Sequence, residues 1–344
     1  MPSIVGGLDI HRKQLTFDYL DTVTGQVTRG QVATADREHF RSWLARFENP
    51  GEVAFAAEAC TGWRYVTEEL QRAGAEAHLA EPADTATQRG KKKRAKTDRA
   101  DARLMRDLLA QGRLPGCWIP PSHVLECRAL LELYHDLRTE HTAWVQRIHA
   151  VLFHQGAPAF HNLSRADAPA ELSALASAHV SPAGQLQLAA CLRMCGTLEA
   201  ELAAVRRRLL SAARHLRGAR ALADSIYGVG PVTALALTCW LGGAGRFTSA
   251  RKAVRFAGLD ITVCSSDRKR PPGRLSRQGP PVLRWAVYEA GKTHARAVAP
   301  DHACYAAVKD RKDGKRAALS EARKIIRRAC HILSELGDDA LAMV

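Results

Sequence analysis

The sequence predicts an α/β domain at the N-terminus followed by two mainly helical regions. Up to about residue 113, short segments with alternating or continuous apolar residues are separated by single helical patterns. From residue 122 onward, apolar residues recur at spacings of three and four over long stretches. A chain of 344 residues with 46% hydrophobic content is expected to form two or three domains.

Residues 1–113 are predicted to form three strands, a helix, a strand, a helix, a strand and a final helix. The fourth strand is apolar on both faces, so we expect it in the centre of the sheet. This order of elements is that of the ribonuclease-H-like fold, which the RuvC-like domains share. The expected strands are 3–9, 14–20, 26–33, 52–58 and 75–80, and the expected helices are 36–47, 61–73 and one from about 97.

Four carboxylates occupy the positions at which that fold places its metal-binding acids. Asp9 lies in the first strand, and Glu58 ends the fourth. Asp98 and Asp101 are three residues apart and share one face of the late helix. The two glycines before Asp9 are expected to leave space beside the strand for the backbone of a ligand.

These four acids predict a metal site for phosphoryl transfer. A charge in a buried strand costs free energy unless a cation or hydrogen bonds satisfy it. Four converging carboxylates would hold two divalent cations, and their hard oxygen ligands favour Mg²⁺ or Mn²⁺. Taken singly, each acid has a plainer explanation, since it could end a strand or favour a helix dipole.

The charge of the chain favours a nucleic-acid partner. Lysine and arginine number 50 against 35 aspartate and glutamate, and the basic residues are clustered rather than spread along one amphipathic helix. No basic leader precedes an apolar run, and no apolar stretch approaches the ~20 residues of a membrane span. Nine cysteines without Cys-x-x-Cys spacing predict reduced thiols and no structural metal cluster. We therefore expect a cytoplasmic protein without membrane contact.

Residues 120–217 are expected to form a helical, coiled-coil segment. Two long helices are predicted, joined by an irregular connection over 155–183 that is rich in alanine, serine, proline and glycine. Such a hairpin could pack on a second copy of the chain or be a plain intramolecular pair.

Residues 218–344 are expected to be mainly helical and to bind DNA. Gly228 and Gly230 open a helix in a pattern that fits a helix–hairpin–helix, whose backbone N–H groups would hold a phosphate. Ser265 and Ser266 adjoin a basic loop, but a serine needs a base to become a nucleophile, and none is close in sequence. The candidate nucleic-acid-binding residues are Lys91, Lys92, Lys93, Arg94, Lys96, Gly228, Gly230, Arg268, Lys269, Arg270, Arg274 and Arg277.

The whole set of motifs resembles the DEDD insertion-sequence transposases, which are related to the Piv-type DNA invertases. The resemblance covers nearly the whole chain. It is carried by the four acids, the Glu-Ala-Cys-Thr-Gly step at 58–62, the Lys-Thr-Asp-Arg-Ala-Asp-Ala motif at 96–102, the Gly-Val-Gly turn at 228–230, and the serine pair that follows Ala-Gly-Leu at 257–259.

The resemblance implies a RuvC-like catalytic domain, a coiled-coil segment and a C-terminal transposase domain. It implies that Asp9, Glu58, Asp98 and Asp101 are catalytic, and that Ser266, with Ser265 as second choice, links covalently to DNA. It further implies a structured guide RNA, the bridge RNA, which pairs with donor and target DNA, and a dimer or tetramer in a bacterial, nucleoid-associated setting. The alternative from the residues alone is a metal-dependent, junction-resolving endonuclease that uses water as nucleophile.

Overall fold

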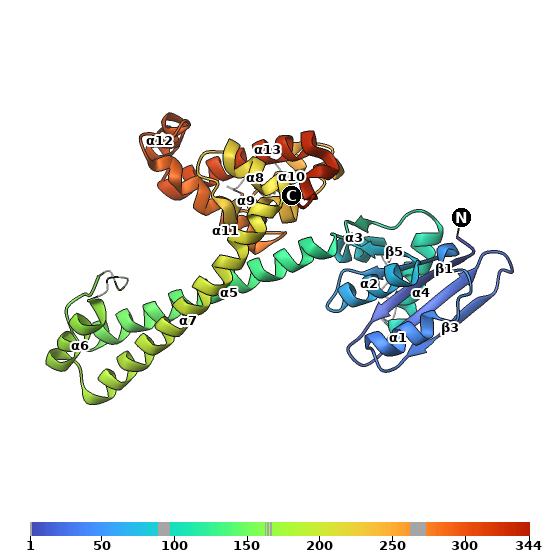
Figure 1. Ribbon diagram of the computed structural model, residues 1–344, viewed down its shortest axis with the longest axis horizontal. Helices are drawn as coiled ribbons and strands as arrows, with labels where there is room; N and C mark the ends of the chain where they lie inside the picture. The colour runs from blue at the N-terminus through green and yellow to red at the C-terminus, as the bar shows by residue number, and fades with distance from the viewer. Residues whose placement is uncertain (1, 89–96, 162, 164, 166, 262–272) are drawn as a thin grey trace, which may run out of the picture. The chain divides into compact units, whose positions relative to one another are not determined.

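The computed structural model describes all residues except 1, 89–96, 162, 164, 166 and 262–272. The chain divides into two compact units, Met1–Ile119 and Pro120–Val344 (Figure 1). The sequence predicts a further division of the second unit at 217/218, which stays a prediction. None of the described helices combines the length and the apolar character that crossing a membrane requires.

The N-terminal unit is built on a six-stranded mixed sheet in the order β3-β2-β1-β4-β5-β6. The first three strands form the predicted antiparallel meander, and β1, β4 and β5 run parallel. β6, an antiparallel edge strand of two residues, was not predicted. The strands are β1 Ile4–Ile10, β2 Leu15–Asp21, β3 Val27–Val32, β4 Val53–Glu58, β5 Glu76–Ala80 and β6 Gly116–Cys117.

Helices cover both faces of this sheet. Successive residues of a strand point to opposite faces, and the central strand β4 shows this directly. Phe55 packs into an aromatic core with Phe40 and Trp43, whereas Ala56 packs against Met105 on the other side. The helices are α1 Arg37–Leu44, α2 Trp63–Ala73, α3 Pro82–Gln88 and α4 Asp98–Ala110, with a 3₁₀ turn at Pro50–Glu52.

The glycine pair in β1 has a different role from the expected one. A Cβ at Gly6 would overlap the ring of Phe55, and a Cβ at Gly7 would overlap the backbone of Ala102 and Arg106 in α4. The space is therefore filled by the protein itself and does not admit a ligand backbone. Gly7 allows α4 to lie directly against β1, which brings the acidic start of α4 toward the end of that strand.

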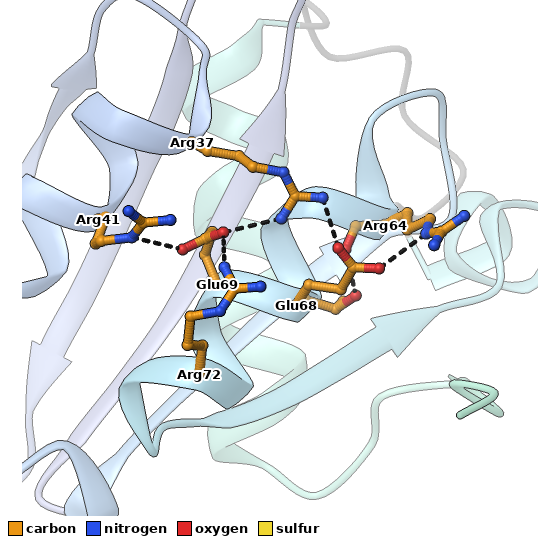
Figure 2. Close-up of polar contacts among 7 residues, drawn as sticks. Arg37, Arg41, Arg64, Glu68, Glu69 and Arg72 are labelled. Carbon is orange, nitrogen blue, oxygen red and sulfur yellow. Dashed lines mark hydrogen bonds and ion pairs between the residues drawn. The ribbon is translucent and has the colours of Figure 1, made fainter. Parts of the chain in front are cut away.

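Ion pairs join α1 to α2 (Figure 2). The carboxylate of Glu69 is 1% exposed and lies among three arginine side chains, and its neighbour Glu68 lies between two. The Arg41 Nε–Glu69 Oε2 distance is 3.0 Å, and the Arg64 Nε–Glu68 Oε1 distance is 2.8 Å. The network contains Arg37, Arg41, Arg64, Glu68, Glu69 and Arg72.

The C-terminal unit begins with two long helices, α5 Ser122–His154 and α7 Pro182–His215, which pack along one another (Figure 1). Their apolar residues meet as the spacing predicts. The connection between them is more regular than expected, because it contains the helix α6 Ala168–His179. Leu172 and Ala176 of α6 are buried against the far end of the pair, which is why this alanine-rich segment is helical.

The remainder of the unit is a cluster of helices around α13. The hydrophobic helix α9 is buried along most of its length, and α13 contacts α8, α9, α10, α11 and α12. The helices are α8 Arg217–Ser225, α9 Pro231–Leu241, α10 Ala250–Phe256, α11 Pro281–Lys292, α12 His302–Arg311 and α13 Gly314–Leu336, with 3₁₀ turns at Ala244–Arg246, Thr293–Ala295 (η3) and Gly337–Leu341.

Candidate active site

Asp9 and Glu58 lie on adjacent parallel strands. Leu8 of β1 is paired with Ala57 of β4, so the two acids occupy the next positions along the same register. Both side chains are partly buried at the carboxyl ends of their strands. In an open sheet of parallel strands this edge is where ligands bind.

Asp98 and Asp101 occupy the first turn of α4. The hydroxyl of Thr97 caps this helix by accepting a hydrogen bond from the backbone N–H of Ala100 at 3.2 Å. Both aspartates are partly buried, whereas Ala100 between them is exposed, so the acid face turns inward. Gln14, at the start of β2, donates to Asp98 Oδ2 at 3.5 Å, which ties the acid end of α4 to the sheet.

The electrostatics of Asp9 report how close the four acids are. Burial raises the pKa of Asp9, and the negative charges of Asp98, Asp101 and Glu58 raise it further, to about 6. His11 acts in the opposite direction. All three of the other predicted acids therefore act on this one carboxylate. Their donor atoms are oxygens only, which suits a hard divalent cation such as Mg²⁺ or Mn²⁺.

A buried ion pair that sequence analysis missed holds α4 against the sheet. Asp18 of β2 is 2% exposed and pairs with Arg106 of α4, which is 6% exposed. Arg29 of β3 adds a second bond, with its Nε 2.7 Å from Asp18 Oδ2. An aspartate in an otherwise β-forming segment was the available signal. Its partner lies 88 positions away, so only the fold reveals the pair.

Basic side chains lie beside the acid end of α4. A surface hollow there is lined by Arg29, Arg99 and Arg103 together with Asp18, Gly30 and Ala100. Arg99 and Arg103 are exposed, so their guanidinium groups face solvent. Groups of this kind contact nucleic-acid phosphates in many proteins.

In the C-terminal unit, the Gly-x-Gly turn joins α8 to α9, and these two helices pack against each other. Gly228 has a φ of +79°, and a Cβ there would overlap the hydroxyl of Thr293. Gly230 caps α9, is exposed, and has open space where a side chain would be. Arg274 and Arg277 are also exposed. The helix–hairpin–helix assignment and the DNA contact stay predictions.

Several predicted residues lie outside the described part of the chain. These are Lys91, Lys92, Lys93, Arg94, Lys96, Ser265, Ser266, Arg268, Lys269 and Arg270.

Two family models match the chain. The model described as "Transposase", of the DEDD type, matches residues 6–154, which include all four acids. The model described as "Transposase IS116/IS110/IS902 family" matches residues 220–306, which include the Gly-x-Gly turn and the serine pair. No curated protein matches the chain. Since the two matches lie in the order expected for one family and together span most of the sequence, this chain belongs to the IS110 family of DEDD-type insertion-sequence transposases and is a DNA transposase.

Proposed function

We propose that Asp9, Glu58, Asp98 and Asp101 form the catalytic metal site of this transposase. The observation that carries this proposal is geometric: Asp9 and Glu58 lie side by side on paired parallel strands, and the helix that begins with Asp98 and Asp101 packs directly against the first of these strands. The raised pKa of Asp9, caused by burial and by the charges of the other three acids, agrees with this placement. Four carboxylates held together without a cation repel each other, and a divalent cation relieves that repulsion. Mg²⁺ or Mn²⁺ bound there would supply Lewis-acid stabilisation of charge at the scissile phosphate.

The proposed chemistry conserves the phosphodiester bond. The Oγ atom of Ser266 attacks the phosphorus, an Oγ–P bond forms, and the bond from phosphorus to the DNA 3′ oxygen breaks. The serine loses its proton and the 3′ oxygen gains one. The 3′ hydroxyl of another strand then attacks the phosphoserine, which restores the serine and joins the new strand. Since one phosphoester bond forms for each one that breaks, ATP is not required.

The carboxylate set has a second task in this scheme. A serine hydroxyl is a weak nucleophile at its ordinary pKa and needs a proton acceptor. No histidine, the commonest general base, is close to Ser266 in sequence. In this scheme one of the four carboxylates of the N-terminal unit accepts that proton.

The proposed partners are donor DNA, target DNA and a structured guide RNA, with the protein acting as a dimer or tetramer. The support for nucleic acid is the net charge of +15 together with the exposed arginines Arg99 and Arg103 of α4. The guide RNA and the oligomer rest on the family resemblance alone.

The test is a denaturing gel of labelled junction DNA incubated with purified protein, Mg²⁺ and RNA from the element's flank. We expect a protein–DNA adduct that survives denaturant and is lost in Ser266→Ala. A matched control is Ser249→Ala, since Ser249 precedes α10 and makes no capping hydrogen bond.

The same gel separates the alternatives. An adduct lost only in Ser265→Ala would move the nucleophile to that residue. Cleavage without any adduct, leaving free 5′ phosphates, would replace the recombinase proposal with a hydrolytic nuclease. An adduct that persists in Asp9→Asn would refute the role of the acid set.

A further inference from the structure

Three ligand-type side chains meet inside the C-terminal unit, and none of them belongs to the set of four acids in the N-terminal unit. His294 lies in the 3₁₀ turn η3 after α11, Asp301 caps α12, and Glu321 belongs to α13. One ligand atom from each residue lies within 4.8 Å of the other two. His294 is 0% exposed and Glu321 is 1% exposed, so neither polar group is in contact with bulk water.

Three buried polar atoms of this cluster lack hydrogen bonds. Within the described residues, neither ring nitrogen of His294 has a hydrogen-bond partner, and neither has Oε2 of Glu321. The His294 Nε2–Asp301 Oδ2 distance is 4.0 Å, which is too long for a hydrogen bond. Buried polar groups in native proteins are nearly always satisfied, by protein, water or an ion. A fully buried imidazole with both ring nitrogens unpaired is therefore suited to binding a ligand.

We propose that His294, Asp301 and Glu321 bind one divalent transition-metal ion. An imidazole beside two carboxylates favours a borderline ion such as Zn²⁺ over Mg²⁺, which takes oxygen ligands. For three atoms within 4.8 Å of each other, a central point is at most about 2.8 Å from each. Zinc–nitrogen and zinc–oxygen bonds are about 2.0–2.2 Å, so the side chains need to close by less than about 1 Å.

Two neighbouring cations compete with the proposed metal. Lys324 Nζ is 2.9 Å from Glu321 Oε1, and Arg328 Nη1 is 2.8 Å from Asp301 Oδ2. Their side chains are 30% and 46% exposed, so their charged ends can move into solvent when a metal binds. The buried His294 and Glu321 have no such freedom. When the metal binds, Glu321 and Asp301 would lose their salt bridges to Lys324 and Arg328 and coordinate the metal ion instead.

The site lies beneath the Gly-x-Gly turn. The ring of Tyr227 meets the ring of His294 edge-on, with 5.4 Å between centroids, and Gly228 packs against Thr293. A metal ion at His294 would join α11, α12 and α13 and brace this turn from below. Its role is thus structural, since His294 and Glu321 are buried and closed off from bulk solvent.

The experiment uses full-length protein carrying Asp9→Asn, Glu58→Gln, Asp98→Asn and Asp101→Asn, which removes the N-terminal acids from metal binding. The chelator-treated protein is titrated with Co²⁺, a spectroscopic substitute for Zn²⁺, and then with Zn²⁺ by calorimetry. We expect one equivalent of Co²⁺ with visible d–d absorption, displaced by Zn²⁺. Addition of His294→Gln or Glu321→Gln should weaken binding at least ~10-fold.

Two further variants keep the test decisive. His331→Gln, on the exposed face of α13, is the matched control and should bind like the parent. Lys324→Met removes the competing ammonium without touching a ligand and should bind more tightly than the parent. Absence of a stoichiometric Co²⁺ spectrum, or equal binding by the parent, His294→Gln and Lys324→Met, would overturn the proposal and leave a buried salt-bridge cluster. Because the acid set is already disabled in this background, either result leaves the proposed active site unaffected.

Discussion

In the N-terminal unit, Asp9 and Glu69 are both carboxylates withdrawn from water, yet their pKa values move in opposite directions. Burial and three neighbouring acids raise the pKa of Asp9 to about 6. Burial also raises the pKa of Glu69, but hydrogen bonds from Arg41, Arg37 and Arg72 outweigh it and lower the value to about 2.

This difference in pKa separates a structural cluster around Glu69 from a candidate binding site around Asp9. The carboxylate of Glu69 has its cations supplied by the protein, so it joins two helices at the surface of the unit (Figure 2). The strongest charges acting on Asp9 are those of other carboxylates. A bound cation would therefore be needed to balance the negative charge of that cluster. The first arrangement stabilises the fold, and the second has the charge expected of the metal site proposed above.

The largest expected effect comes from breaking the acid cluster. Asp9→Asn should reduce DNA cleavage about 10³-fold or more, equivalent to ~4 kcal/mol of lost transition-state stabilisation. The metal-free fold should persist. Cleavage rates on junction DNA under single-turnover conditions measure this, with circular dichroism as the check on folding. Activity within about tenfold of wild type would remove Asp9 from the catalytic set.

Breaking the arginine-bound carboxylate should have the opposite outcome. Glu69→Gln leaves three arginines around a neutral amide, so the free energy of unfolding should fall by about 3 kcal/mol. The cleavage rate per folded molecule should not change. Urea denaturation measures the first and active-fraction kinetics the second. The control is Glu76→Gln, whose side chain is 63% exposed and whose loss should cost little.

The close contact between β1 and α4 is expected to affect both the stability of the fold and the affinity of the acid cluster for metal. Gly7→Ala places a methyl group against the backbone of Ala102 and Arg106, so α4 has to move away from the strand. We expect a loss of about 2 kcal/mol in the free energy of unfolding and a higher Mg²⁺ concentration for half-maximal cleavage. Gly116→Ala, where a side chain meets nothing within 4 Å, is the control. An unchanged Mg²⁺ requirement would show that the position of α4 does not control metal affinity.

The smallest expected effect is on the pH dependence of stability. Because the folded-state pKa of Asp9 is raised, the folded protein binds more protons than the unfolded chain between about pH 4 and pH 6. The metal-free protein should therefore lose about 1 kcal/mol of stability as the pH rises through that window, after allowance for solvent screening. Asp9→Asn should lack this loss, and Mg²⁺ at pH 7 should offset it in wild type. Urea denaturation at pH 4 and pH 7 measures the free energy of unfolding of wild type and of Asp9→Asn. The same pH dependence in both proteins would contradict this prediction.

Local pattern predicted most of the elements and failed where stability comes from distant contacts. Each of the five main strands was predicted from its own local pattern. Examples are the alternation around Phe17 in β2 and the continuous apolar run of β4. The two-residue strand β6 exists only because β5 offers it an edge, and α6 is helical because it packs on the ends of α5 and α7. β6 is too short to have a periodic signal, whereas the buried residues of α6, Ala168, Leu172 and Ala176, recur every four positions, and the sequence analysis missed this spacing.

The candidate site divides in the same way. Asp9, Glu58, Asp98 and Asp101 could be named from the sequence because each occupies a defined place in the order of strands and helices. The ion pair of Asp18 with Arg106 could not be predicted, since a charge within a strand signals that some partner is needed but does not identify one 88 positions away.

The sequence by itself therefore determined the order of strands and helices along the N-terminal part of the chain, the four candidate acids, the basic character and the family resemblance. The tertiary structure decided which groups meet. It showed that Gly7 admits a helix and not a ligand, that three acids act on Asp9, and that His294, Asp301 and Glu321 converge. The physical reason is the distance over which each kind of interaction acts. Hydrophobic periodicity and turn chemistry act over a few residues, whereas desolvation and charge interactions depend on distances in space that only the folded chain defines.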